Sequence, residues 1–135
     1  MTIYRSDAVR NALMDALDTA RGASVKVQLR SGASAGTGGG GTLLAELTGN
    51  ATGWAGASSA GVLTSNSITA DSSADASGTI GHYELLTSGS TWLESGIADT
   101  GGTDGVTVDA ATTTAGQTVQ MSGNWVNTAA YDDGV

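Results

Sequence analysis

The chain of 135 residues has the length of one domain, and it contains no cysteine, proline or phenylalanine. Without cysteine, neither disulfides nor thiolate metal sites can hold the fold together. Residues 1–30 carry five basic and three acidic side chains, a charge of +2, whereas residues 31–135 carry ten acidic and no basic ones, a charge of −10. This acidic body argues against binding nucleic acid through phosphate contacts. No apolar run approaches the roughly 20 residues of a membrane-spanning helix, so no membrane contact is expected.

Residues 6–21 are predicted to form the single helix of the chain. Ser6 or Asp7 can cap its start, and Gly22 directly follows Arg21 as a terminating glycine. Apolar residues recur at spacings of three and four: Val9, Ala12, Leu13, Ala16, Leu17 and Ala20. We expect this stripe to pack on the domain's own sheet, and a neighbouring subunit is the alternative.

Two strands with a glycine-rich loop between them are predicted next. In residues 24–30, three apolar and three polar side chains alternate, which is typical of a half-exposed strand. Residues 31–41 lack periodicity and are expected to be flexible unless a partner holds them. Residues 42–48 form the second strand, with Leu43, Ala45 and Leu47 facing inward and Leu44 and Glu46 facing outward.

Residues 61–89 are read as two strands, 62–68 and 80–86, joined by a polar, acidic turn at 71–78. Alternation places His82 and Glu84 on one face of the second strand, and Tyr83 and Leu85 on the other. Trp54 is expected in the core, because a chain without phenylalanine has few other large groups to bury.

Shorter apolar segments complete the predicted β domain. They are residues 91–98, Val106 with Val108, and 117–125, with turns at 99–105 and 112–116. Seven or eight short strands about ten residues apart are typical of an antiparallel β-sandwich or jelly-roll-like domain. We therefore predict a mainly β fold with an N-terminal helix at 1–22, a sandwich at 23–127 and an acidic tail at 128–135.

Catalytic and ligand-binding patterns are present but weak. Residues 36–41 satisfy G-x-G-x-x-G, yet a strand is expected after them instead of the helix that a phosphate site requires. Asp-Thr-Gly at 99–101 resembles half of an aspartic protease site, and a single copy would need a homodimer. His82 is the single histidine and is interpreted as a surface or interface residue.

Acidic side chains near turns are candidate calcium ligands, but their spacing is not that of an EF-hand. They are Asp71, Asp75, Asp99, Asp104 and Asp109. We expect them to form turns and to keep the protein soluble. The sequence thus predicts no enzyme, no cofactor and no metal site.

Several residue patterns are similar to those of a family of small virion proteins of tailed bacteriophages. They are Gly-Thr-Leu-Leu-Ala at 41–45, Gly-Val-Leu-Thr at 61–64, Ile-Thr-Ala-Asp at 68–71, Ala-Asp-Ala-Ser-Gly-Thr at 74–79, Tyr-Glu-Leu-Leu at 83–86 and the Val-Asp…Ala-Gly-Gln-Thr-Val segment at 108–119. The match covers most of residues 6–125. The loop after the first strand departs from the pattern, because members of the family usually carry prolines there.

The resemblance implies a structural protein of the virion, assembled in the bacterial host, that decorates or cements the head by binding the major capsid protein. It also implies a homo-oligomer, a dimer or trimer, on the particle. The expected partner-binding surface is the helix and first strand, with the basic residues Arg5, Arg10, Arg21, Lys26 and Arg30. A tail, fibre or adaptor component is the first alternative. A carbohydrate-binding module using Trp54 or Trp92, or a dimeric aspartic protease, is a further one.

Overall fold

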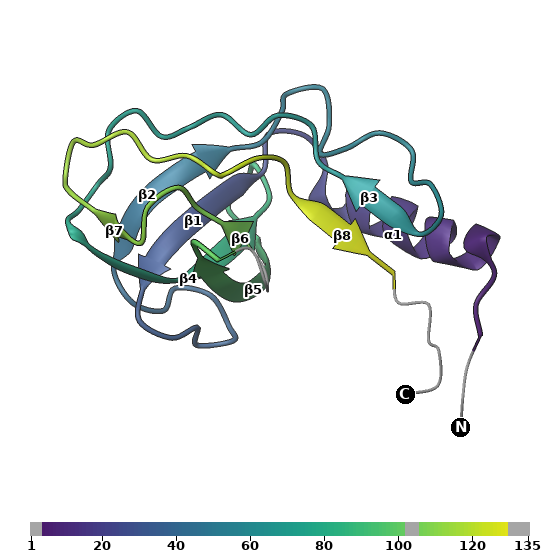
Figure 1. Cartoon of the computed structure of the whole chain (residues 1–135), viewed down its shortest axis with the longest axis horizontal. Coiled ribbons are helices and arrows are strands. Elements are labelled where there is room, and N and C mark those ends of the chain that lie inside the picture. Colours follow the sequence, from purple (N-terminus) through teal and green to yellow (C-terminus); the bar gives the residue numbers. More distant parts are fainter. Residues whose placement is uncertain (1–3, 102–105, 130–135) are drawn as a thin grey trace.

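The computed structural model describes residues 4–101 and 106–129 (Figure 1). The fold is mainly β with one N-terminal helix, as the sequence predicts. Its elements are α1 (Asp7–Arg21), β1 (Lys26–Ser31), β2 (Leu43–Thr48), β3 (Val62–Thr64), β4 (Gly78–Leu86), β5 (Trp92–Asp99), β6 (Val106–Thr107), β7 (Thr112–Thr113) and β8 (Val126–Thr128). None of the described residues belongs to a helix long and apolar enough to cross a membrane.

The main sheet is curled and has the strand order β2-β1-β4-β5-β6, with β7 paired to the start of β4. All its pairs are antiparallel except β5 with β6, which run parallel. The connecting segments around Asp71 and Val119 pair with each other through a single bridge. Both segments pass over one face of the sheet (Figure 1). This covering layer makes the domain sandwich-like, although its second layer contains little regular strand.

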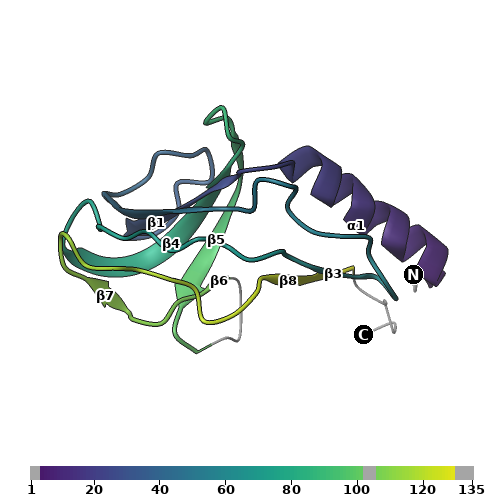
Figure 2. The same cartoon turned by 90° about the horizontal axis from the view of Figure 1, so that it is seen from above.

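β3 and β8 form a separate two-stranded ribbon beside α1. Figures 1 and 2 show that the helix and the ribbon extend together beyond the main sheet. We call α1, β3 and β8, with residues 4–6 that precede the helix, the arm. The arm presents apolar surface that the rest of the domain does not cover.

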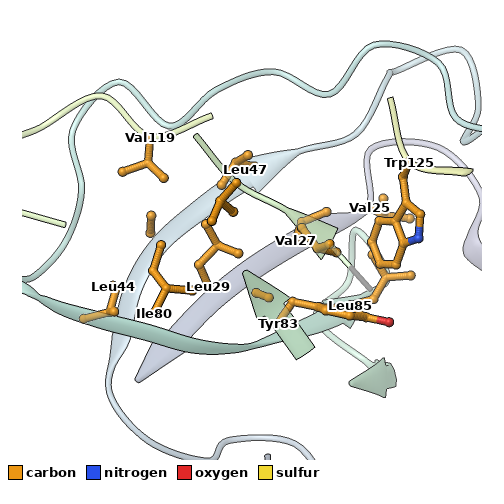
Figure 3. Close-up of a cluster of buried hydrophobic side chains, with 14 of the residues drawn as sticks. Val25, Val27, Leu29, Leu44, Leu47, Ile80, Tyr83, Leu85, Val119 and Trp125 are labelled. Atoms are coloured by element: carbon orange, nitrogen blue, oxygen red, sulfur yellow. The ribbon is translucent and has the colours of Figure 1, made fainter. Parts of the chain in front are cut away.

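The core lies between the sheet and the segments that cross it (Figure 3). Val25, Val27 and Leu29 of the first predicted strand are fully buried, as their alternation predicts. Trp54 is 1% exposed, which confirms its predicted place in the core. The rings of Trp54 and Tyr83 both meet the Trp125 ring edge to face, with centroid distances of 5.1 and 4.7 Å. Other members of the core include Leu44, Leu47, Leu63, Ile80, Leu85, Val106, Val108 and Val119.

Leu44 was expected to face outward, but it is buried. The pairing of β1 with β2 shifts register between Leu29 and Arg30, so one extra residue of β2 is accommodated there. Such a bulge re-aims the side chains on either side of it. Leu44 consequently packs against Gly78 at the start of β4, where any side chain would collide with it.

The predictions for the last third of the chain are partly wrong. Residues 117–125 do not form a strand, because they cross from the main sheet to the ribbon and pair only singly, at Val119 and Met121. The turn predicted at 112–116 contains β7. Residues 126–128 form β8, and the Ala129 N–H donates to the Gly61 carbonyl, so the predicted tail starts later than residue 128. Residues 130–135 of that tail lie outside the described residues.

Candidate functional site

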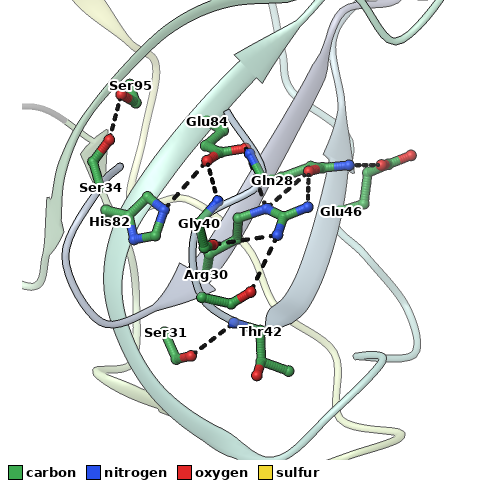
Figure 4. Close-up of polar contacts among 12 residues, drawn as sticks. Gln28, Arg30, Ser31, Ser34, Gly40, Thr42, Glu46, His82, Glu84 and Ser95 are labelled. Carbon is green, nitrogen blue, oxygen red and sulfur yellow. Dashed lines mark hydrogen bonds and ion pairs between the residues drawn. The ribbon is translucent and has the colours of Figure 1, made fainter. Parts of the chain in front are cut away.

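Polar side chains gather on the face of the sheet opposite the core (Figure 4). Glu46, Gln28, Glu84 and Ser95 stand in register across β2, β1, β4 and β5. The predicted alternation in β4 is confirmed, since Tyr83 and Leu85 join the core while Glu84 lies among these polar groups. We call Gln28, Arg30, Glu46, His82 and Glu84 the polar cluster.

Glu84 is the centre of the polar cluster, and its side chain is 1% exposed. The backbone N–H groups of Gly39 and Gly40 donate to its two carboxylate oxygens, at N···O distances of 2.9 and 3.1 Å. The Arg30 Nε atom lies 3.3 Å from Glu84 Oε2. Two backbone donors and a guanidinium therefore surround a carboxylate that water does not reach.

These donors keep Glu84 ionised despite its burial. Desolvation by itself would raise the pKa of the Glu84 carboxyl, whereas the Gly39 and Gly40 N–H groups, the Arg30 charge and His82 lower it. The net result is a pKa below the ordinary value. A carboxylate that holds its negative charge so firmly is suited to binding the loop and poorly suited to accepting a proton as a general base.

The glycine-rich loop at 32–41 has its partner within the chain. Besides the two N–H groups on Glu84, its Gly40 carbonyl accepts from Arg30 at 3.3 Å, and Ser34 Oγ lies 2.6 Å from Ser95 Oγ of β5. The expected flexible loop is thus tied to β1, β4 and β5. Its backbone N–H groups do bind an anion, as a G-x-G-x-x-G match suggests, but that anion is the chain's own carboxylate.

His82 is buried, so its interpretation as a surface residue was wrong. Its Nδ1 atom lies 2.8 Å from the Gly32 carbonyl oxygen, which can only accept, and therefore Nδ1 carries a proton. Its Nε2 atom lies 3.5 Å from Glu84 Oε1 and has no hydrogen-bond partner. The ring bridges the start of the loop and the carboxylate that binds the loop's end.

Two of the aspartates predicted near turns, Asp71 and Asp99, accept backbone N–H groups. Asp71 Oδ2 accepts from Glu46 of β2 and Oδ1 from Ser73, and Asp99 Oδ1 accepts from Gly101 in a short turn. Within residues 4–101 and 106–129, no three histidine, aspartate or glutamate side chains gather to hold a metal ion. Asp104, also considered as a calcium ligand, lies outside the described residues.

The five basic residues do not form one surface. Arg10 and Arg21 are buried: Arg10 bonds to Asp7 and to the Ala129 carbonyl, and Arg21 pairs with Glu94 at 2.9 Å. Two further basic side chains bind within the main sheet, Lys26 to Ser90 and Glu46, and Arg30 to Glu84 and Gln28. Arg5 is half-buried just before the helix.

Arg21 connects the arm to the core. Its guanidinium carbon lies 4.9 Å from the Trp54 ring centroid and 5.1 Å from that of Trp125, while its nitrogens donate to Glu94 of β5 and Asn127 of β8. Burial and the negative charge of Glu94 raise the pKa of Tyr83 above its ordinary value, so Tyr83 stays a neutral donor to Glu94. Sequence reasoning did not predict this contact, because Glu94 and Asn127 lie far from Arg21 along the chain.

The apolar stripe of α1 does not pack on the sheet, contrary to expectation. Val9 and Leu13 are 49% and 48% exposed, and the alanines of the stripe are exposed as well. The other side of the helix faces the chain instead, and there the half-buried Met14 packs against the core beside polar residues. Asn11, Asp15 and Asp18 accept the backbone N–H groups of Gly61, Ser58 and Ala55. Residues 55–61 carry only small side chains, so their N–H groups require acceptors from elsewhere.

Sequence reasoning therefore missed the loop-binding role of Glu84, and it considered a helix stripe that does not pack on the sheet only as the alternative. Comparison with known protein families, with curated proteins and with solved structures finds no match to this chain.

Proposed function

We propose that the chain is a structural protein of a tailed-bacteriophage virion, a decoration or cement protein that binds the major capsid lattice and stabilises the head. The resemblance in residue pattern over residues 6–125 supports this assignment. The polar cluster supports a non-enzymatic role, because its central carboxylate is saturated by the chain's own donors.

The observation that carries the proposal is where the exposed apolar side chains lie. Among the described residues there are five large exposed ones, and all but Ile97 belong to the arm: Tyr4, Val9, Leu13 and Val126. Exposed apolar groups that gather on one projecting element are typical of a protein–protein contact. Many such weak contacts, repeated by the symmetry of a capsid, give firm attachment through avidity.

The arm also carries the basic residue for which a partner contact is best supported. Arg10 and Arg21 have too little exposed surface to bind another molecule, whereas Arg5 is half-buried at the start of the arm. We propose that Arg5 meets an acidic surface of the capsid protein. Lys26 and Arg30, which bind within the main sheet, are not needed for that contact.

Co-sedimentation with undecorated phage heads and, separately, with tails tests the proposal. We expect saturable binding to heads that weakens in raised salt and in Arg5→Glu. Lys26→Glu is the control, since it makes the same charge change on the main sheet and should leave binding unchanged. Binding to tails alone would support the tail, fibre or adaptor alternative, and binding to neither particle would refute the virion assignment.

A further inference from the structure

The contact between His82 and Glu84 changes character with the charge of the imidazole (Figure 4). His82 Nδ1 donates to the Gly32 carbonyl at 2.8 Å, so in the neutral ring Nε2 is an unprotonated acceptor. That nitrogen lies 3.5 Å from Glu84 Oε1, which is also an acceptor, and it has no hydrogen-bond partner. Both side chains are almost fully buried. With the ring neutral, two acceptors therefore face each other in a site shielded from bulk water, which is unfavourable.

The Glu84 carboxylate can accept one more hydrogen bond on the side that faces His82. Its Oε2 atom accepts from the Gly39 N–H and lies 3.3 Å from Arg30 Nε. Its Oε1 atom accepts from a single donor among the residues that the structure describes, the Gly40 N–H. A carboxylate oxygen has two acceptor positions, so a proton on His82 Nε2 would supply the second bond to Oε1. Hydrogen bonds between charged groups are roughly twice as strong as neutral ones.

We infer that the glycine-rich loop at 32–41 is a pH-sensitive strap, which the sheet holds more tightly when His82 is protonated. The imidazolium donates from Nδ1 to Gly32 at the start of the loop and from Nε2 to the carboxylate that binds Gly39 and Gly40 near its end. Deprotonation removes the second of these bonds and leaves two acceptors in contact. The closure of the loop thus depends on pH through one side chain, which goes beyond the proposed function.

The charged groups around His82 act on an imidazolium in opposite directions. Glu84 favours it, and so does Asp99 at the end of β5, two residues beyond Ile97, which pairs with His82. Arg30, directly opposite on β1, opposes it, but the Arg30 guanidinium is already paired with Glu84. The loop itself contains no charged residue. Glu84 is the charged group in direct contact with the ring, and it therefore decides the sign of the effect.

Two titrations define the pH range in which the loop is held most tightly. The bond from His82 forms as the pH falls from about 8 to about 5, the range in which histidine side chains change charge. The pKa of Glu84 lies below its ordinary value, so the carboxylate keeps its charge in mild acid and loses it only in stronger acid. The hold should therefore be strongest near pH 5. Opening at higher pH would uncover the ring of Trp92, against which Gly38 packs so closely that a Cβ there would collide with it.

Hydrogen exchange of the Gly39 and Gly40 amides in the full chain, measured by NMR from about pH 8 to about pH 5, tests the inference. After correction for the intrinsic pH dependence of exchange, protection in the wild type should rise about tenfold towards the acidic end. His82→Asn is the control, since an asparagine amide can still donate to the Gly32 carbonyl but does not titrate. Its protection should stay nearly constant. Constant protection in the wild type, or the same pH dependence in both chains, would overturn the inference.

The ring of His82 gives a second test that needs no variant, because it is the single histidine of the chain. Proton–nitrogen correlation spectra follow both ring nitrogens over the same pH range. We expect Nδ1 to stay protonated, Nε2 to gain the proton, and the amide signals of Gly39 and Gly40 to shift with the same midpoint. A neutral ring protonated at Nε2, or loop amides that do not follow the ring, would refute the strap. Neither measurement involves phage heads, so the strap and the virion assignment are tested separately.

Discussion

The polar cluster gives the sharpest test of how the glycine-rich loop is held. Glu84→Gln keeps the size of the side chain and removes its charge. The amide offers one oxygen to two backbone donors, so either the Gly39 or the Gly40 N–H loses its acceptor. A buried donor without a partner costs about 1–3 kcal/mol, and Arg30 loses its ion pair as well. Part of this loss is offset, because the variant no longer has to bury the negative charge of Glu84.

We therefore expect Glu84→Gln to lower the free energy of unfolding by about 2–4 kcal/mol, out of the roughly 5–15 kcal/mol of a typical domain. Glu46→Gln is the matched control, since it is the same substitution on the same face, but its carboxylate is about a third exposed and lies 3.8 Å from Lys26. Exposed pairs of this kind contribute less than about 1 kcal/mol. Urea unfolding measures both changes.

The effect of Glu84→Gln should also depend on pH. The pKa of Glu84 is lower in the folded chain than in the unfolded chain. Its contribution to stability is therefore complete above the unfolded value of about 4.3 and disappears as the pH falls through the folded value. Wild type and variant should accordingly converge in acid. Equal stabilities at neutral pH, with unchanged hydrogen exchange of the Gly39 and Gly40 amides, would refute the role assigned to Glu84.

Two further substitutions test the contacts that join the elements. Arg21→Lys should lower the free energy of unfolding by about 1–3 kcal/mol and shift the tryptophan emission. Lysine cannot both bind two acceptors and cover the rings of Trp54 and Trp125. Unchanged emission and stability in this variant would contradict the role of Arg21. Gly81→Ala should destabilise the folded chain by more than about 1 kcal/mol in thermal unfolding, because the new Cβ would collide with the Gly32 carbonyl of the loop. Gly56→Ala is the control, since its Cβ would meet nothing within 4 Å and should leave stability unchanged. Equal melting temperatures in these two alanine variants would show that the loop moves aside freely.

The sequence predicted most of the main sheet because its strands alternate. β1, β2, β4 and β5 lie where apolar and polar residues alternate or where an apolar run ends at glycine. The pairing of β3 with β8 was harder to predict, because each strand has three residues and the two lie more than 60 positions apart in the chain. Local pattern carries no information about such a distant partner. Residues 117–125 alternate well, but alternation follows burial, and Val119 and Trp125 are buried without belonging to a strand.

The orientation of α1 could not be read from periodicity. The helix has an apolar stripe and, on its other side, a polar one at Asn11, Asp15 and Asp18, and either stripe could face the chain. What decides is the segment that α1 meets. Residues 55–61 offer few apolar atoms to cover and several N–H groups to satisfy, so the polar stripe gains more from the contact. That choice depends on tertiary structure, which the sequence pattern does not contain.

The same physical device explains why so acidic a chain can fold with so few large side chains. Segments rich in glycine, alanine and serine cannot be fixed by packing, because they have little to pack. Here carboxylates fix them by accepting their backbone N–H groups, and charge strengthens each bond. The acidic residues therefore stabilise the fold directly. From the sequence alone, we expected them only to form turns and to keep the protein soluble. The carboxylates that act in this way are Asp15, Asp18, Asp71, Glu84 and Asp99. Because α1 uses Asp15 and Asp18 in this manner, it meets the chain through its polar stripe, and its apolar side chains Val9 and Leu13 stay exposed.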